Sequence, residues 1–172
     1  MSEESLLLAV RNEIRTSLKY KPSECDVEFD GRPLAIAGET YIAVWPGEWS
    51  NDGQTEHFLD ERHGVQVNVY LRAPKVPRDR SRNLLLDAKA SVNVRCRAIM
   101  LAIHMNYAVM DAANDLLLPS ATGFHHPLRF QGCSAPQVVT GDYFYAQSES
   151  FAGLLRTIRF GGAIRYQTLP AT

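Results

Sequence analysis

Residues 65–71 read VQVNVYL, and this stretch decides the fold class of the chain. Valine or leucine stands at positions 65, 67, 69 and 71, and these residues alternate with Gln66, Asn68 and Tyr70. Successive side chains of a strand point to opposite faces of a sheet, so the alternation predicts a strand with one face in a core. The other set of side chains, which continues to Arg72, is predicted to face water or a partner.

Further strands are predicted on both sides of this segment. They are expected where β-branched and aromatic residues cluster, at residues 41–45, 128–130, 142–146, 155–160 and 163–169, with Gly161-Gly162 separating the last two. The polar, acid-rich stretch 48–61 is predicted to be a long loop, which in a compact domain is commonly mobile or used for contact.

Apolar residues recur at the spacing of a helix in three places. The first helix is predicted over about residues 5–20 with Ser5 as its cap, the long second helix after residues 78–83 to about Asn106, and a third piece over residues 107–117. The stripe of the second helix comprises Leu85, Ala88, Val92, Ile99 and Ile103.

The order helix, strands, helices, strands predicts an α/β chain of the α+β type. A mainly antiparallel sheet is expected, with the N-terminal helix and the long helix packed on one face. A length of 172 residues with 45% apolar residues fits a single domain over 1–172.

The location of the chain is predicted from its apolar runs and cysteines. No stretch reaches the eighteen or so apolar residues that cross a bilayer, and the N-terminus MSEESLLLAVRNE carries acids where a signal peptide carries basic residues. Cys25, Cys96 and Cys133 are odd in number and far apart, so neither a disulfide framework nor a metal knuckle is indicated. A reducing compartment and no membrane contact are therefore expected.

The net charge of −1 hides a division of charge along the chain. Residues 1–63 hold thirteen acids against six Lys and Arg, whereas residues 64–172 hold six acids against twelve Lys and Arg. Opposite potentials on two faces favour head-to-tail contacts between copies of one chain. The alternative is that both sets are ordinary solvated faces.

Sequence motifs for catalysis are missing. The chain has no GxxxxGK[ST] or GxGxxG loop for phosphate and no GxSxG nucleophile elbow. No catalytic residue, cofactor or metal site is predicted, and the chain is expected not to be an enzyme.

The histidines leave one alternative of another class. His57, His63 and His125 with nearby carboxylates could ligate a metal in a metal-dependent enzyme. Their spacing fits no metal pattern, so surface or interface histidines are favoured. The acids Asp60 and Glu61 are likewise better explained by a solvated loop than by acid–base catalysis.

A run of cations, Arg72, Lys75, Arg78, Arg80 and Arg82, could meet phosphate groups. The run has no interleaved aromatic residues and the whole chain is slightly acidic, so specific nucleic-acid binding is not expected. A solvated or subunit-contacting face is the favoured interpretation.

Several of these segments, taken together, resemble the tail terminator family of long-tailed bacteriophages. The resemblance covers about residues 5–105 and rests on residues 29–33 (FDGRP), the strand at 41–45, the acidic loop, the strand at 65–71 and its exit at 73–79 with Pro74 and Pro77. The chain departs from the family in an added segment at about 123–150 and in its closing strands. The turn and the prolines would be structural markers rather than catalytic residues.

The resemblance implies an assembly role in the virion. It implies a ring of six copies that stops polymerisation of the tail tube and presents a surface to the head connector. The partners would be the chain itself, the tail-tube protein and a head connector or head-closure protein, in a tail or neck assembled in the host cytoplasm. Head-closure and tail-completion subunits are the alternatives within the neck.

The candidate residues for contact between subunits combine the acidic loop, the outward set of the strand and the basic exit. Trp49 belongs to this set because large amphipathic rings serve as interface anchors. The full set is Trp49, Glu56, Asp60, Glu61, Tyr70, Arg72, Lys75, Arg78 and Arg80.

Overall fold

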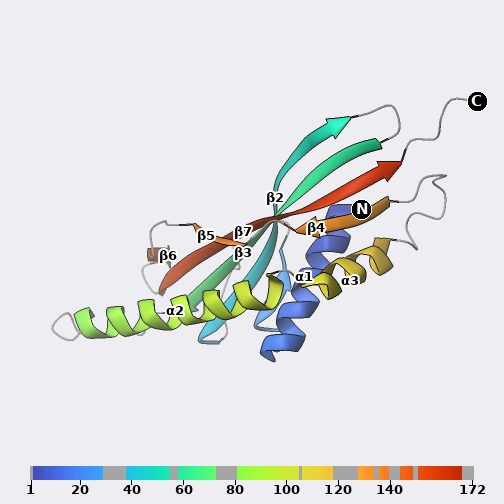
Figure 1. Cartoon of the computed structure of the whole chain (residues 1–172). Coiled ribbons are helices and arrows are strands. Elements are labelled where there is room, and N and C mark those ends of the chain that lie inside the picture. The colour runs from blue at the N-terminus through green and yellow to red at the C-terminus, as the bar shows by residue number, and fades with distance from the viewer. Residues whose placement is uncertain are drawn as a thin grey trace, which may run out of the picture.

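The computed structural model describes residues 2–28, 38–54, 58–72, 81–104, 106–117, 128–133, 136–139, 144–148 and 151–167. Within these ranges three helices and a seven-stranded sheet form an α+β fold, which confirms the predicted fold class (Figure 1). The turn at 29–33 and the exit at 73–79, on which the family resemblance partly rests, lie outside the described residues.

The three helices are α1 (Ser2–Leu18), α2 (Ser81–Ile103) and α3 (Tyr107–Leu117). Ser5 does not cap α1 as predicted, because the helix begins one turn earlier and Ser5 is buried within it. The long helix stops at Ile103 and α3 is a separate helix. The Oδ1 of Asn106 accepts a hydrogen bond from the backbone N–H of Ala108 at 3.1 Å, which satisfies one of the orphan donors at the start of α3.

The strands are β1 (Cys25–Val27), β2 (Thr40–Gln54), β3 (Phe58–Arg72), β4 (Leu128–Cys133), β5 (Gln137–Val139), β6 (Phe144–Ser148) and β7 (Phe151–Gln167). The main path through the sheet is β1-β2-β3-β7-β4, and β5 and β6 also pair with β7. β1 runs parallel to β2 and the other described pairs are antiparallel. A mainly antiparallel sheet is therefore confirmed.

Two strands are longer than the sequence indicates. The predicted loop at 48–61 is wrong, because β2 and β3 continue through it and pair as far as Gln54 and Leu59. β7 also runs unbroken through Gly161-Gly162, where a break was predicted. Polar residues and glycines are tolerated in both places because β3 is hydrogen-bonded to β2 on one side and to β7 on the other.

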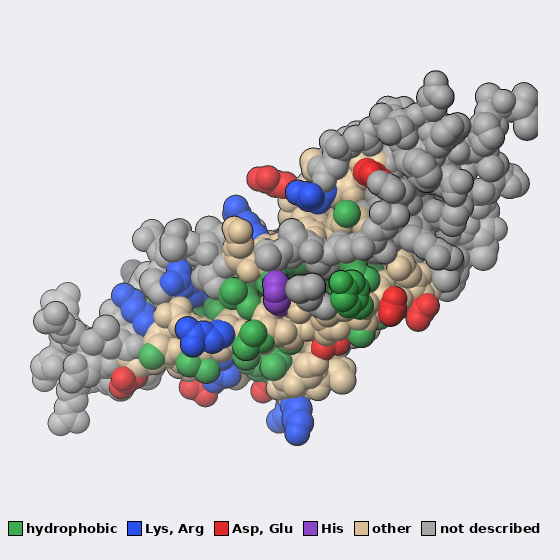
Figure 2. Space-filling view, in the orientation of Figure 1, with side chains coloured by type: hydrophobic (Ala, Val, Ile, Leu, Met, Phe, Trp, Pro, Cys, Tyr) green, Lys and Arg blue, Asp and Glu red, His purple; other side chains and the backbone are tan. Residues whose placement is uncertain are grey.

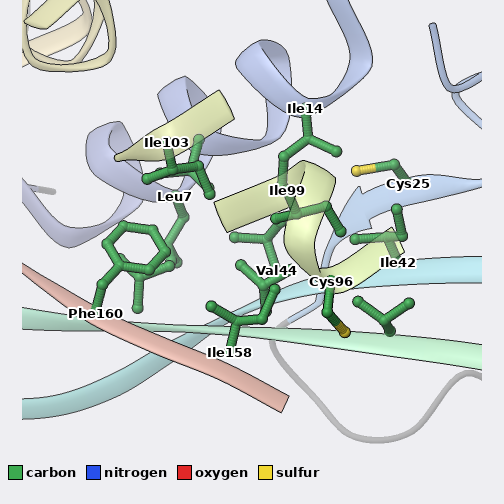
Figure 3. Close-up of a cluster of buried hydrophobic side chains, with 14 of the residues drawn as sticks. Leu7, Ile14, Cys25, Ile42, Val44, Cys96, Ile99, Ile103, Ile158 and Phe160 are labelled. Carbon is green, nitrogen blue, oxygen red and sulfur yellow. The ribbon is translucent and has the colours of Figure 1, made fainter. Parts of the chain in front are cut away.

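The helices cover one face of the sheet, as predicted. Val65, Val67, Val69 and Leu71 of β3 point to this face and are buried. In Figure 3, side chains of α1 and α2, such as Leu7, Ile14 and Ile99, point toward Val44 and Ile158 of the sheet. The predicted stripe of α2 is confirmed at three positions, because Val92, Ile99 and Ile103 are buried.

Three glycines on neighbouring strands form what we call the waist: Gly47 of β2, Gly64 of β3 and Gly161 of β7. A Cβ at Gly64 would lie 2.5 Å from the backbone oxygen of Glu48, and one at Gly47 would lie 2.8 Å from the backbone carbon of Gly64. The β2–β3 register shifts here, between Pro46 and Trp49, as in a β-bulge. In Figure 1 the twisted sheet is seen edge-on at its middle, and β2, β3 and β7 spread apart beyond it.

The sheet beyond the waist is called the arm. It consists of residues 49–54 of β2, 58–63 of β3 and 163–167 of β7, together with β4. β4 lies beside α3, whereas α2 packs on the half of β3 and β7 before the waist (Figure 1). The waist therefore divides one continuous sheet into two parts with different surroundings.

The close contacts at the waist predict that one added methyl group destabilises the folded protein. Gly64→Ala is expected to lower the free energy of unfolding by about 1–3 kcal/mol, because its Cβ meets backbone atoms that cannot rotate away. Chemical denaturation of the purified protein measures this change. The matched control is Gly38→Ala, whose Cβ would lie at an ordinary 3.9 Å from the nearest atom, so that a change within about 0.5 kcal/mol is expected. Equal effects of the two substitutions would contradict the close approach.

The buried thiols predict a second measurable property. Burial raises the pKa of Cys25 from 9.0 to about 12 and that of Cys96 from 9.0 to about 11. The unfolded chain ionises these thiols first, so their contribution to stability is complete below pH 9.0 and is lost as the pH rises toward these values. Iodoacetamide at about pH 8 is expected to modify both cysteines only after unfolding, since the thiolate is the nucleophile. Rapid labelling of either thiol in the folded protein would contradict this.

Candidate functional site

The face of the sheet opposite the helices was predicted to carry an exposed polar set. This prediction is wrong for two of its members, since Asn68 is only 6% exposed and Tyr70 only 2%. Tyr70 packs with Ala43, and Tyr41, Trp45 and Leu155 lie against them. The rings of Tyr41 and Tyr70 are tilted against one another with centroids 6.5 Å apart. A second, smaller apolar cluster therefore occupies this face.

Two hydrogen bonds, one from β7 and one from within β3, satisfy the side-chain oxygen of Asn68 beside this cluster. The hydroxyl of Thr157 donates to Oδ1 of Asn68 at 2.9 Å, and the amide of Gln66 donates to the same oxygen at 3.1 Å. Cross-strand pairs of this kind allow a polar side chain to be buried without an unmet donor or acceptor. Tyr70, a predicted subunit contact, is thus an interior residue of its own chain.

A pocket of about 420 Å³ lies at the waist. Its lining includes Glu48, Arg62, Gly64, Gln66, Arg159 and Gly161. Gly64 pairs with Gly161, and the pair carries no side chains, which leaves a hollow between larger neighbours. The pocket is thus a direct result of the glycines that permit the close approach of the strands.

Two arginines border this pocket from different strands. Arg159 pairs with Gln66, so both side chains rise on the same side of the hollow. Arg62 stands on the other side, and its aliphatic stem leans over Gly161, where a Cβ would lie 3.1 Å from its Cγ. Arg62, Arg159 and the carboxylate-bearing Glu48 are all exposed. The pocket therefore presents two guanidinium groups and one carboxylate to solvent.

The remaining predicted contact residues lie at the two ends of β3. Asp60 and Glu61 lie in the arm and are half-buried, whereas Arg72 is exposed at the opposite end and pairs with Gly153. Twelve residues separate Asp60 from Arg72, which corresponds to about 40 Å along an extended strand. The acids and the base are thus brought to different ends of the molecule and form no common site.

The other candidates are only partly described. The backbone of Trp49 pairs with His63 in the arm. Glu56, Lys75, Arg78 and Arg80 lie outside the described residues.

His63, one of the three histidines considered for metal binding, lies beside a carboxylate of its own strand. Nε2 of His63 lies 3.2 Å from Oε2 of Glu61, and His63 is only 6% exposed. His57 and His125 lie outside the described residues. In the described ranges no three His, Cys, Asp or Glu side chains gather in a way that could hold a metal ion.

The glycines at positions 64, 161 and 162 are the sequence signal for this pocket. Gly64 and Gly161-Gly162 stand out in their strands, but Gly161-Gly162 was interpreted as a break, and only the β3–β7 pairing places it beside Gly64. Arg62 and Arg159 were not predicted as site residues, since they are far apart in the sequence and come from segments of opposite net charge.

No protein-family model matches this chain, and no curated protein matches its sequence. None of the described helices is long and apolar enough to span a bilayer. The fold, the pocket and the distribution of charge are therefore the basis for a functional proposal.

The interior position of Tyr70 leads to a testable contrast with another tyrosine. Tyr70→Ala is expected to lower the free energy of unfolding by about 3–5 kcal/mol, because it leaves a cavity beside Tyr41 and Leu155. The matched control is Tyr107→Ala in α3, where the side chain is 67% exposed and a change within about 0.5 kcal/mol is expected. Thermal or denaturant unfolding at low protein concentration measures both. If Tyr70→Ala instead weakened only self-association, the interior assignment would be wrong.

Proposed function

We propose that this chain is an assembly subunit of a bacteriophage neck, which forms a ring that caps the tail tube and joins it to the head connector. The proposal starts from the resemblance of residues 5–105 to tail terminators. The α+β fold, with α1 first and with β2 and β3 before the long helix α2, is compatible with the small α/β protein that this resemblance implies. The chain would act by contact between surfaces and not by catalysis.

The observation that carries this proposal is the polarity of β3. This strand carries Asp60 and Glu61 beside the exposed Arg62 in the arm, and Arg72 at its other end, about 40 Å away along the strand. A surface that offers acids at one end and a base at the other can pair these charges with a second copy of itself in a head-to-tail arrangement. Head-to-tail contacts generate closed rings when the rotation between copies closes. Such a ring provides two distinct rims, one for the tube and one for the connector.

The alternative within this class is a head-closure or tail-completion subunit. Such a subunit also assembles in the neck, but it contacts the head connector without binding the end of a tail tube. Binding of the purified ring to the end of a tail tube, or to the head connector alone, therefore distinguishes the two roles.

The proposed role predicts a defined assembly. Native mass spectrometry is expected to show rings of about six copies, alone or on addition of the tail-tube subunit, because the ends of β3 are complementary. Tube polymerised in its presence is expected to stop growing, with the ring at one end in electron micrographs. A chain that stays monomeric under both conditions and leaves tube growth unchanged would contradict the proposal.

A charge reversal tests the part played by β3. Arg72→Glu is expected to reduce the share of rings, since it gives both ends of the strand the same sign. Lys21→Glu, at an exposed position between α1 and β1, is the control with the same change in charge and is expected to leave the rings intact. An equal loss of rings in both variants would point to net charge and not to β3.

A further inference from the structure

The long helix α2 carries apolar side chains on two opposite sides. Val92, Ile99 and Ile103 are buried in the core, as expected for a helix that covers a sheet. On the other side Val94 is 68% exposed and Leu101 is 71% exposed. A helix on the surface of a protein ordinarily carries charged and polar residues on its outer side. The outer side of α2 is therefore more apolar than the fold alone requires.

The exposed residues of this outer side follow the spacing of a contact between two helices. Five of them recur at alternating steps of three and four residues, on the side of the helix opposite Val92. We call this set the outer stripe: Asp87, Ala90, Val94, Arg97 and Leu101. Steps of three and four residues are the pattern by which one helix packs along another.

The outer stripe is open to a partner. Figure 1 shows α2 in front of the sheet, and Figure 2, from the same side, shows hydrophobic side chains on the face along which α2 runs. Within the described part of the chain, neither Asp87 nor Arg97 forms an ion pair. Exposed apolar side chains with charged residues around them are typical of a surface that another protein covers.

Asp87 and Arg97 restrict how a second copy of α2 can lie on the outer stripe. Both residues are five positions from Val92, which is the midpoint of α2 (Ser81–Ile103). An antiparallel copy with its ends level places Asp87 of each copy opposite Arg97 of the other. A parallel copy places Asp87 beside Asp87 and Arg97 beside Arg97, and like charges repel. The order of the charges therefore fits an antiparallel second copy.

The apolar residues fit the same antiparallel arrangement. Ala90 and Val94 are each two positions from the midpoint of α2, so Ala90 of one copy meets Val94 of the other twice. A small side chain opposite a larger one allows two helices to approach closely. Leu101 meets the first turn of the other copy's helix. The centre of the contact is thus apolar and has an ion pair on each side.

We propose that the outer stripe of α2 binds the outer stripe of a second copy of this chain, with the two helices antiparallel about a two-fold axis at the level of Val92. Such a contact uses the same surface on both copies and is complete at two copies. It differs from the head-to-tail contact between the ends of β3, which continues from copy to copy. The pairing of α2 goes beyond the proposed function and does not depend on it.

The size of the contact predicts a weak dimer. A helix of 23 residues is about 35 Å long, and one helix from each copy gives an interface at the small end of specific protein contacts. A dissociation constant in the micromolar range is therefore expected. Dimers are expected to form at the usual concentrations of purified protein and to dissociate on dilution.

Exchange of the two charges tests the pairing and its direction. Arg97→Asp alone and Asp87→Arg alone each place like charges opposite one another twice in the antiparallel dimer. Each is expected to raise the dissociation constant roughly tenfold or more in sedimentation velocity experiments. Asp87→Arg combined with Arg97→Asp in one chain restores opposite charges and is expected to recover the dimer. In a parallel dimer each residue meets its own copy, so neither single substitution would have this effect.

A polar substitution tests the apolar centre of the contact. Val94→Gln is expected to raise the dissociation constant roughly tenfold, because it removes an apolar side chain from both halves of the dimer. The matched control is Leu116→Gln in α3, where the side chain is 39% exposed and lies outside the outer stripe. This control is expected to leave the dimer unchanged.

Further controls separate the pairing from general charge effects and from misfolding. Lys21→Glu and Asp111→Arg lie outside α2 and carry the same changes in charge as Arg97→Asp and Asp87→Arg. Both are expected to dimerise as the unchanged chain does. The substituted positions are exposed, so the melting temperature at a concentration where the chain is monomeric is expected to stay unchanged. A variant that melts early is replaced by Arg97→Gln or Asp87→Asn, which remove a charge without reversing it.

Measurements in the Arg72→Glu variant separate this dimer from the proposed ring. Arg72 lies at the end of β3 and not on α2, so dimers are expected to persist in this variant. A variant that is monomeric at every concentration, single charge reversals that leave the dimer unchanged, or a double variant that does not recover it would overturn the pairing. Each of these results could occur while rings of the unchanged chain still cap tail tube. Dimers that behave as expected, in a chain that never binds tail tube, would support the pairing and remove the neck role.

Discussion

The close approach of the backbones of β2 and β3 at Gly47 and Gly64 is the constraint on which the rest of this structure depends. A Cβ at either position would lie within 3 Å of backbone atoms of the other strand, so this close approach exists only because both residues lack one. The close approach accompanies the register shift between β2 and β3 and lies between the arm and the part of the sheet under α2. It also leaves the hollow in which two arginines face solvent. One local steric condition thus affects both the course of the sheet and a pocket that is lined by its strands.

Alternation in the sequence predicted one side of β3 correctly and the other side wrongly. Val65, Val67 and Val69 are buried under the helices because alternate side chains share one face of the sheet, and an apolar face is stabilised by removal from water. The same pattern was taken to mean that Asn68 and Tyr70 are exposed. Alternation identifies the two faces of a strand, but it does not show that the polar face is exposed to solvent. Asn68 is buried because Thr157 supplies a hydrogen bond from a strand that is distant in sequence.

The amino-acid composition of the arm led to a wrong prediction of a loop. The candidate site could not be predicted from the sequence because it also depends on strand pairing. The stretch 48–61 has the composition of a loop, yet residues 48–54 belong to β2 and residues 58–61 belong to β3. The two strands pair with each other here, and β3 also pairs with β7. Arg62 and Arg159 become neighbours only through that ladder. A charge count by halves of the chain places Arg62 among acids and so conceals the basic pocket. Pairing register, which local sequence does not encode, was the missing information in both cases.

The position of β7 in the chain affects how the protein folds. β7 follows the other described elements in sequence, yet it forms hydrogen bonds with β3, β4, β5 and β6. During synthesis on the ribosome, β2 and β3 emerge early and can form their hairpin, but the second edge of β3 has no partner until residues 151–167 are made. Long-range pairing of this kind makes folding slow and leaves strand edges open to association. A chain of this design is therefore vulnerable to premature aggregation while it is still nascent.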